Sequence, residues 1–320
     1  MASKYKIGGK AILTDSDGAR DLIAESVVYE DTFTATNTIR SLAPDYFTNY
    51  FPPSNPFQGG VSGYVSGGKF PQFTSHNNID KFPFSTDANA TDVGDLTRNA
   101  GEITGQSSSS NGYSTGPNVI DKFPFASDGN ATDVGDLTQT RVGPTGNSSQ
   151  TVGSGYSSGG DINPGGSSNV IDKFPFAADA NASDVGNLTN TREDQSGQSS
   201  AENGYISGKF PPFSPTTQNI NKFPFASDAN ATNIGEQTAG RDRSSGQSSD
   251  VSGYTSGGAT GSYKTNIIDK FPFSTDTNAT DVGDLATSRS WISEQSSFTN
   301  GYASGGWLSP PYNGENIIEK

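Results

Sequence analysis

Residues 112–137 read GYSTGPNVIDKFPFASDGNATDVGDL, and close copies of this stretch recur along the chain. The phrase Lys-Phe-Pro-Phe occurs five times and the phrase Gly-Tyr six times, at intervals of 41 to 51 residues. Self-similarity at a nearly fixed period indicates a repeat architecture, in which each copy forms one structural unit. The repeats therefore decide the fold class.

Each copy has four parts that read as short strands bounded by turn residues. In chain order they are Gln-Ser-Ser, Gly-Tyr-x-Ser, Val-Ile-Asp-Lys-Phe-Pro-Phe and Thr-Asp-Val-Gly-Asp-Leu. Four strands in about 49 residues are typical of a propeller blade, whereas a solenoid rung is shorter and a helical repeat needs a 3.6-residue apolar period that is missing here. We expect an all-β propeller of six blades, or of five if the last copy serves only as a clasp that closes the ring.

The recurring aromatic and arginine residues are expected to be structural. Phenylalanines two positions apart share one face of a strand, where their rings can fill the space between blades. Double glycines such as Gly67-Gly68 would end a strand with positive φ. The arginines could pair with Asp80, Asp121, Asp172 and Asp269, although the fourth repeat has Asn221 there. The structural set comprises Phe82, Phe84, Phe123, Phe125, Phe174, Phe176, Phe223, Phe225, Phe271, Phe273, Tyr64, Tyr113, Tyr156, Tyr205, Tyr254, Tyr302, Arg98, Arg141, Arg192, Arg241 and Arg289.

Composition excludes several classes of function. The 320 residues include no cysteine and one histidine, His76, so thiolate chemistry and multi-histidine metal centres are ruled out. A net charge of −14 with scattered basic residues argues against nucleic-acid binding. No apolar run suits a membrane span or a signal peptide. We expect a soluble protein without cofactor or membrane insertion, with His76 in a polar loop.

The turns after Phe-Pro-Phe have oxygen-bearing side chains at alternate positions, as at the start of a calcium loop. The EF-hand pattern needs Gly at its sixth position and Glu at its twelfth, where this chain has Asp92 and Arg98. Asx turns that cap backbone donors are the favoured interpretation, and glycosylation of the same Asn-Ala-Thr phrases is disfavoured without a signal peptide. The calcium candidates are Asp87, Asn89, Asp128, Asn130, Asp179, Asn181, Asp228, Asn230, Asp276 and Asn278.

Enzymatic activity is not expected. Ser-His-Asp, Cys-His and Walker-type arrangements are missing, and the candidate carboxylates follow the repeat, as architectural residues do. The irregular features are better candidates for a contact surface. They are the inserts 69–73 and 209–213, with Trp291 and Trp307. Exposed aromatic loops on a rigid ring favour protein or glycan contacts.

From residue 61 to 320, the succession of arginine, Ser-rich strand, Gly-Tyr-x-Ser-Gly-Gly, Ile-Asp-Lys-Phe-Pro-Phe and Val-Gly-Asp-Leu resembles a kelch-type β-propeller repeat. The chain departs from that pattern because it has Val or Ile where kelch repeats carry tryptophan, at Val93, Val134, Val185, Ile234 and Val282. The wording of the repeats also resembles propeller repeats in virion proteins of tailed, especially marine, bacteriophages.

Residues 1–60 contain no copy of the repeat. Their Ile7-Gly8-Gly9, Asp15-Ser16 and Arg20-Asp21-Leu22 are similar to openings of phage tail-fibre-like proteins, where this end attaches to the particle. The resemblance implies an assembly arm at 1–60 that contacts other virion proteins, a propeller at 61–320, and an oligomeric place in a tail, fibre or capsid surface. The propeller would display loops for host-surface protein, host glycan or inter-subunit contacts.

Two alternatives stay open. One is a carbohydrate-binding or carbohydrate-active propeller, which predicts a cluster of aromatic residues and carboxylates at one mouth of the ring. The other is a filament-forming or adhesive cell-surface protein, in which the open end of one ring accepts a strand from the next.

Overall fold

The computed structural model describes residues 60–69, 74–162, 164–208, 218–261, 263–308 and 314–320, together with the backbone of β1 (Lys4–Ile7) and β2 (Lys10–Thr14). The chain divides into two compact units, Met1–Ser54 and Asn55–Lys320. In the first unit, β1 and β2 pair antiparallel. The rest of the expected assembly arm up to residue 59, and the inserts at 70–73 and 209–213, lie outside the described residues.

The expectation of an all-β chain is confirmed. Within the described ranges every regular element is a strand, and no helix there is long and apolar enough to cross a membrane. The strands of the second unit are β3 (Ser62–Ser66), β4 (His76–Pro83), β5 (Thr91–Ala100), β6 (Thr104–Ser107), β7 (Asn111–Thr115), β8 (Val119–Pro124), β9 (Thr132–Asp136), β10 (Thr145–Ser149), β11 (Ser154–Ser158), β12 (Val170–Pro175), β13 (Ser183–Asn187), β14 (Ser196–Ser199), β15 (Asn203–Ser207), β16 (Asn219–Pro224), β17 (Thr232–Glu236), β18 (Ser245–Ser248), β19 (Ser252–Ser256), β20 (Ala259–Thr260), β21 (Tyr263–Lys264), β22 (Ile267–Pro272), β23 (Thr280–Asp284), β24 (Arg289–Ser290), β25 (Ser293–Ser296), β26 (Gly301–Ser304), β27 (Trp307–Leu308) and β28 (Ile318–Glu319).

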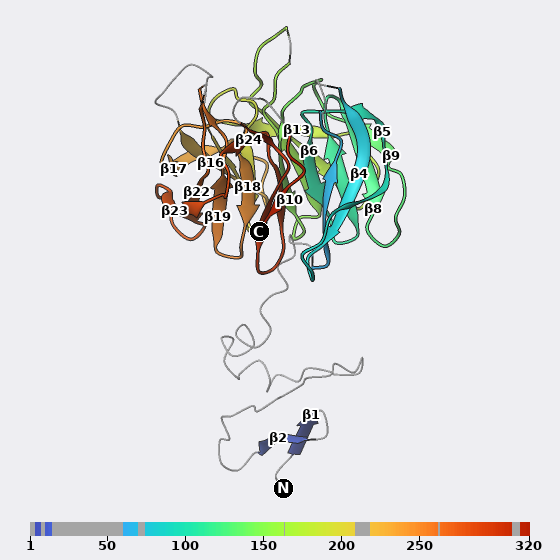
Figure 1. Cartoon of the computed structure of the whole chain (residues 1–320). Helices are drawn as coiled ribbons and strands as arrows, with labels where there is room; N and C mark the ends of the chain where they lie inside the picture. The colour runs from blue at the N-terminus through green and yellow to red at the C-terminus, as the bar shows by residue number, and fades with distance from the viewer. Residues whose placement is uncertain are drawn as a thin grey trace. The chain divides into compact units, whose positions relative to one another are not determined.

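Six blades form the ring of the second unit (Figure 1). The second to fifth blades are four-stranded antiparallel sheets, in the orders β6-β7-β8-β9, β10-β11-β12-β13, β14-β15-β16-β17 and β18-β19-β22-β23. The four parts read from each sequence copy are the four strands of one blade. The first strands of successive blades, here called inner strands, contact one another in the order β6, β10, β14, β18, β25 around the axis.

The blades at the two ends of the ring are incomplete among the described residues. The first blade is β3-β4-β5 and the sixth is β25-β26-β28, each with three described strands, and β28 pairs with β26 alone among the described residues. Side chains link the sixth blade to the first. The Gln295 amide donates to the carbonyl oxygen of Tyr64 at 3.3 Å, and the equivalent amides of the second to fifth blades, from Gln106, Asn147, Gln198 and Gln247, donate to a tyrosine carbonyl in the same way.

The Gly-Tyr and Phe-Pro-Phe phrases are coupled within each blade by strand register. Gly155 on β11 lies directly opposite Phe174 on β12, and a Cβ at Gly155 would come within 2.3 Å of that ring. The other four pairs, Gly63–Phe82, Gly112–Phe123, Gly204–Phe223 and Gly253–Phe271, repeat this contact. Each ring therefore lies flat over a glycine and covers the backbone that the glycine leaves bare.

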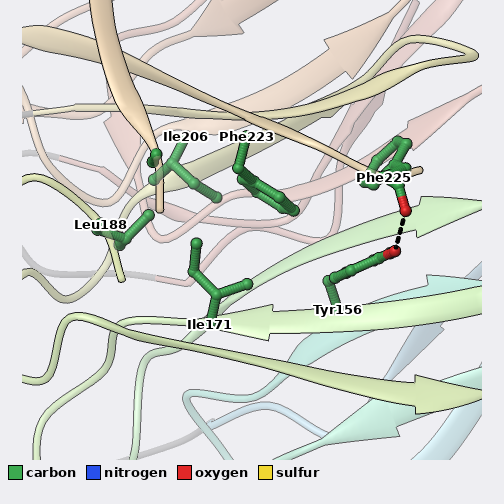
Figure 2. Packing of buried hydrophobic residues seen from close by; sticks show 7 residues of the cluster. Tyr156, Ile171, Leu188, Ile206, Phe223 and Phe225 are labelled. Atoms are coloured by element: carbon green, nitrogen blue, oxygen red, sulfur yellow. Dashed lines mark hydrogen bonds between the residues drawn. The ribbon is translucent and has the colours of Figure 1, made fainter. Parts of the chain in front are cut away.

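Aromatic rings then join each blade to the next. The Tyr156 ring on β11 stacks on Phe225 of the following blade with ring centres 4.9 Å apart, and meets Phe223 at 5.5 Å. Its hydroxyl donates to the Phe225 carbonyl oxygen at 3.2 Å (Figure 2). Ile171 and Leu188 complete this buried cluster. The core is a series of small clusters between blades, which is how a chain with 30% hydrophobic residues forms one.

His76 was expected in a polar loop, but it is the first residue of β4. In the first blade β5 continues to Ala100, so that His76 pairs with Ala100 across the two strands. Because β5 is long, strand pairing includes His76, although the polar residues beside it in the sequence are typical of a turn.

Candidate binding site at the axial mouth of the ring

The repeated arginines lie in the connections between blades and are buried. Arg141 Nη2 lies 2.8 Å from the Asp172 carboxylate, and both side chains are fully buried. The Thr138 hydroxyl and amide also donate to this carboxylate, at 2.6 and 3.0 Å. The double glycine makes room, because a Cβ at Gly160 would lie 3.2 Å from the Arg141 side chain. Arg98, Arg241 and Arg289 form corresponding pairs with Asp121, Asp269 and Glu319.

The fourth blade has a different pairing at this position. Asn221 accepts both Thr189 hydrogen bonds, at 2.8 and 2.9 Å, so the link between blades is kept without a carboxylate. Burial lowers the pKa of Arg192 to about 10, with no acidic partner to oppose the shift. In Arg141 burial also lowers the pKa, but the charge of Asp172 opposes it.

The calcium candidates lie on the outer side of the blades, where they link neighbours. Asp128 Oδ1 accepts from Lys81 of the preceding blade at 2.9 Å, and Asn130 Oδ1 accepts from the Asp95 amide at 3.0 Å. The aspartates Asp179, Asp228, Asp276 and Asp87 bind Lys122, Lys173, Lys222 and Lys320, and Asn181, Asn230 and Asn278 accept from Asp136, Asn187 and Glu236. The described residues contain no group of three or more His, Cys, Asp or Glu arranged for a metal. The preference for Asx turns over calcium sites stays a prediction.

One end of the axis carries a second repeated arrangement, which we call the axial mouth. It consists of Glu102, Gly143, Asp194, Arg243 and Trp291, each two residues before an inner strand, with φ between 54° and 62°. Each amide donates to the carbonyl of the equivalent residue one blade back, at 2.7 to 2.9 Å over four successive links. Left-handed backbone at a non-glycine residue costs about 1–3 kcal/mol and is concentrated at functional sites.

The side chains at the axial mouth differ from blade to blade. The Arg243 guanidinium lies over the Trp291 ring, 4.6 Å from its centre, and 3.3 Å from the Asp194 carboxylate. Glu102 binds Lys69 at 2.8 Å. Trp291 is 38% exposed. The result is a partly exposed indole with a guanidinium over its ring and carboxylates on neighbouring blades, an arrangement suited to binding a polar ligand that also has an apolar face.

Carboxylates at the axial mouth influence one another. Burial raises the pKa of Asp194 to about 7, the charge of Arg243 opposes the shift, and Glu193 and Glu102 add to it. The pKa of Glu193 is also raised by burial and by neighbouring carboxylates. The crowding of acidic groups makes the mouth electronegative, because Lys69 and Arg243 are its cations among the described residues.

Below the mouth, Glu294 lies where the other inner strands have glycine. The inner strands are so close that a Cβ at Gly197 would lie 2.1 Å from the Gly146 carbonyl oxygen. The Glu294 carboxylate accepts from the Gly246 amide at 2.7 Å. Burial raises its pKa to about 8, although the amides of Gly246 and Gly197 oppose the shift. Glu294 therefore fills the axial space that the glycines leave.

This shift predicts how Glu294 affects stability with pH. A carboxyl whose folded pKa is raised from 4.5 to about 8 contributes stability that is present below pH 4.5 and lost as pH rises through 8. Glu294→Gln is therefore expected to reduce the loss of stability between pH 5 and pH 8, measured as the urea midpoint at each pH. Glu202→Gln, on an exposed turn, is the matched control. Parallel pH profiles for wild type and Glu294→Gln would contradict this role.

Sequence reasoning singled out Trp291 but missed Glu102, Glu193, Asp194, Arg243 and Glu294. The sequence does contain a signal for this site. When the copies are aligned, the position of the axial mouth holds five different residues, and Glu294 stands where the other copies have glycine. Trp307 lies in β27, where it pairs with Ser290. Comparison with protein-family models and with curated protein sequences finds no match to this chain.

Proposed function

We propose that the chain is a non-enzymatic binding protein whose rigid ring presents the axial mouth to a saccharide on a host-cell surface. The observation that carries the proposal is the partly exposed Trp291 ring, near carboxylates, at a position that holds a different residue in each of five blades. Positions that hold the same residue in every blade serve packing. The five residues of the axial mouth differ, and their side chains have no packing role in common.

The chemistry of the mouth selects among saccharides. An indole face packs against the apolar face of a pyranose ring, and carboxylates and guanidinium groups bind its hydroxyls. The mouth has three acidic residues, Glu102, Glu193 and Asp194, and two basic ones, Arg243 and Lys69. This excess of acidic groups disfavours binding of a negatively charged saccharide. The expected ligand is a neutral or amino saccharide rather than a uronic or sialic acid.

We place this binding protein on a tailed-bacteriophage particle. The support is the wording of the repeats and the similarity of residues 6–22 to the openings of tail-fibre-like proteins. Residues 1–60 would bind the protein to other virion proteins. Several copies on one particle would bind several saccharides at once, so that attachment is firm although each single affinity is weak.

Tryptophan fluorescence tests the binding site directly, because the chain has two tryptophans. With Trp307→Phe, Trp291 becomes the single reporter, and neutral or amino oligosaccharides are expected to change its emission saturably. Trp291→Ala is expected to weaken binding by about tenfold or more, as for an aromatic residue at the centre of an interface. Sialylated oligosaccharides serve as the charge control. Unchanged emission with every saccharide, or equal binding by Trp291→Ala, would contradict the proposal.

A carbohydrate-cleaving function is the second candidate, and the pKa of about 7 at Asp194 is what favours it. A carboxyl that is partly protonated near neutral pH can act as a general acid when a second carboxyl group lies nearby, and Glu193 is the adjacent residue in the chain. The same titration distinguishes the two functions if reducing ends are measured afterwards. We expect none to be released, and release that is lost in Asp194→Asn would establish the second candidate instead.

A further inference from the structure

Arg243 is held less firmly than the repeated arginines between the blades. The side chains of Arg141 and Arg241 are fully buried, lie 2.8 and 2.9 Å from a carboxylate, and donate to a backbone carbonyl of their own blade. The Arg243 side chain is 35% exposed. Its Nε lies 3.3 Å from Asp194 without making a hydrogen bond, and its Nη1 lies 3.6 Å from Asp242. Attraction between charges therefore holds this guanidinium, rather than the hydrogen bonds that fix the buried arginines.

The two carboxylates beside Arg243 are fixed in place. The Asp194 side chain is 13% exposed, and a Cβ at Gly143 would come within 2.5 Å of its Oδ1, so glycine at that position leaves room for the carboxylate. The Asp242 side chain is 14% exposed, and its backbone forms a β-bridge with Ala259. If the guanidinium moves away, both carboxylates remain and can receive another cation.

The position between these carboxylates and the Trp291 ring has the chemistry of a cation subsite. The Arg243 guanidinium occupies it, 4.6 Å from the centre of the indole. A cation over an aromatic face is attracted by the electrons of the ring, most strongly at tryptophan. Trp291 is 38% exposed, so a ligand that arrives from solvent can reach the same ring. The chain itself therefore shows which kind of group this position accepts.

We propose that this position is an ammonium subsite for an amino saccharide, and that Arg243 is an internal competitor which the ligand displaces. The inference rests on the proposed saccharide-binding function and narrows its ligand class. The ammonium group of the amino sugar binds between Asp194 and Asp242, and the apolar face of the sugar ring packs against Trp291. Arg243 turns toward solvent, to which it is already partly exposed. An N-acetylated sugar lacks the positive charge and so loses this attraction.

The other charged groups near the subsite favour the same class of ligand. Burial raises the pKa of Glu193, and the charges of Asp161 and Glu102 add to the shift while that of Arg243 opposes it. These carboxylates therefore lie close enough to act on a cation at the mouth. Lys69 is bound to Glu102 and cancels one of them. Arg243 is then the residue that sets how strongly a cationic saccharide is preferred, because its own charge repels the ammonium group.

The test compares a glucosamine oligomer with the same oligomer after full N-acetylation. Both are titrated against the Trp307→Phe chain, in which Trp291 is the single tryptophan, and the glucosamine oligomer is expected to bind more tightly. Arg243→Gln is expected to strengthen binding of the glucosamine oligomer by about tenfold and to change binding of the N-acetylated one by no more than about threefold. If Arg243 only held Trp291 in place, its removal would weaken both. Arg243→Lys keeps the charge and is expected to bind like the parent chain.

Lys69→Gln is the matched charge control, because it removes the cation that binds Glu102 rather than the one over Trp291. It is expected to strengthen binding of the glucosamine oligomer less than Arg243→Gln does. Circular dichroism shows whether each variant is folded. Equal binding of the two oligomers by the parent chain, weaker binding of the glucosamine oligomer by a folded Arg243→Gln, or an equal gain in Lys69→Gln would overturn the ammonium subsite.

The same titrations separate this inference from the proposed function. If both oligomers bind at Trp291 with equal affinity, saccharide binding stands and the ammonium subsite is wrong. If neither oligomer changes the emission of Trp291, both proposals are wrong.

Discussion

Phe223→Ala is expected to lower the free energy of unfolding by about 3–5 kcal/mol, the range for deleting a buried aromatic side chain. Phe223 is 1% exposed and serves two contacts at once. Its ring covers Gly204 within its own blade and meets Tyr156 of the preceding blade at 5.5 Å. The variant therefore leaves a cavity inside a blade and also weakens the interface between two blades.

Urea denaturation followed by circular dichroism measures this loss. Phe298→Ala is the control, because Phe298 is 53% exposed and its removal is expected to change stability by no more than about 0.5 kcal/mol. Similar losses in the two variants would mean that the rings between blades contribute little beyond surface coverage.

Asp172→Asn is expected to be destabilising by about 3–5 kcal/mol, the cost of removing one partner of a buried ion pair. The Arg141 charge would then be fully buried without a carboxylate. The Thr138 hydrogen bonds would survive, because Asn221 accepts the same two bonds from Thr189 in the fourth blade. The fall in the urea midpoint therefore measures the loss of the Arg141–Asp172 ion pair and not the loss of the Thr138 hydrogen bonds.

The reciprocal change is expected to stabilise the chain. Asn221→Asp would give Arg192 a carboxylate, and because Arg192 is buried without one, the urea midpoint should rise. Because both substitutions are made in the same protein, their effects on the urea midpoint can be compared directly. If Asp172→Asn has no effect, or Asn221→Asp lowers stability, the desolvation of the carboxylate outweighs its attraction to the arginine.

Much of the fold follows from local sequence. Turn residues separate four short strands in each repeat, and side chains two positions apart share a face, so the Phe123–Phe125 pair could be assigned to a space between blades. The number of blades followed from counting copies. How the two ends of the ring meet could not be predicted, because it depends on the incomplete first and last copies, which the repeat pattern does not describe.

The axial mouth could not be derived in the same way. Glu102, Asp194, Arg243 and Trp291 adopt left-handed backbone, which side chains of these types disfavour, and a ring of hydrogen bonds between blades holds them in it. Such bonds join residues about 41 to 51 positions apart, so no local pattern predicts them. The pKa values of Asp194 and Glu193 are raised mainly by burial, and carboxylates on other blades add to the shift.

The contact of Tyr156 with Phe225 also limits how this chain can change in evolution. In each of the five tyrosine–phenylalanine contacts between described blades, one blade presents a tyrosine and its neighbour presents a phenylalanine pair, so the interface is head-to-tail and has a fixed sense of rotation. Such an interface closes only when a whole number of steps completes a turn, about 60° for each of six blades. A duplication or deletion of one repeat would keep every local contact yet leave an open spiral, so repeat number should change far less readily than loop sequence.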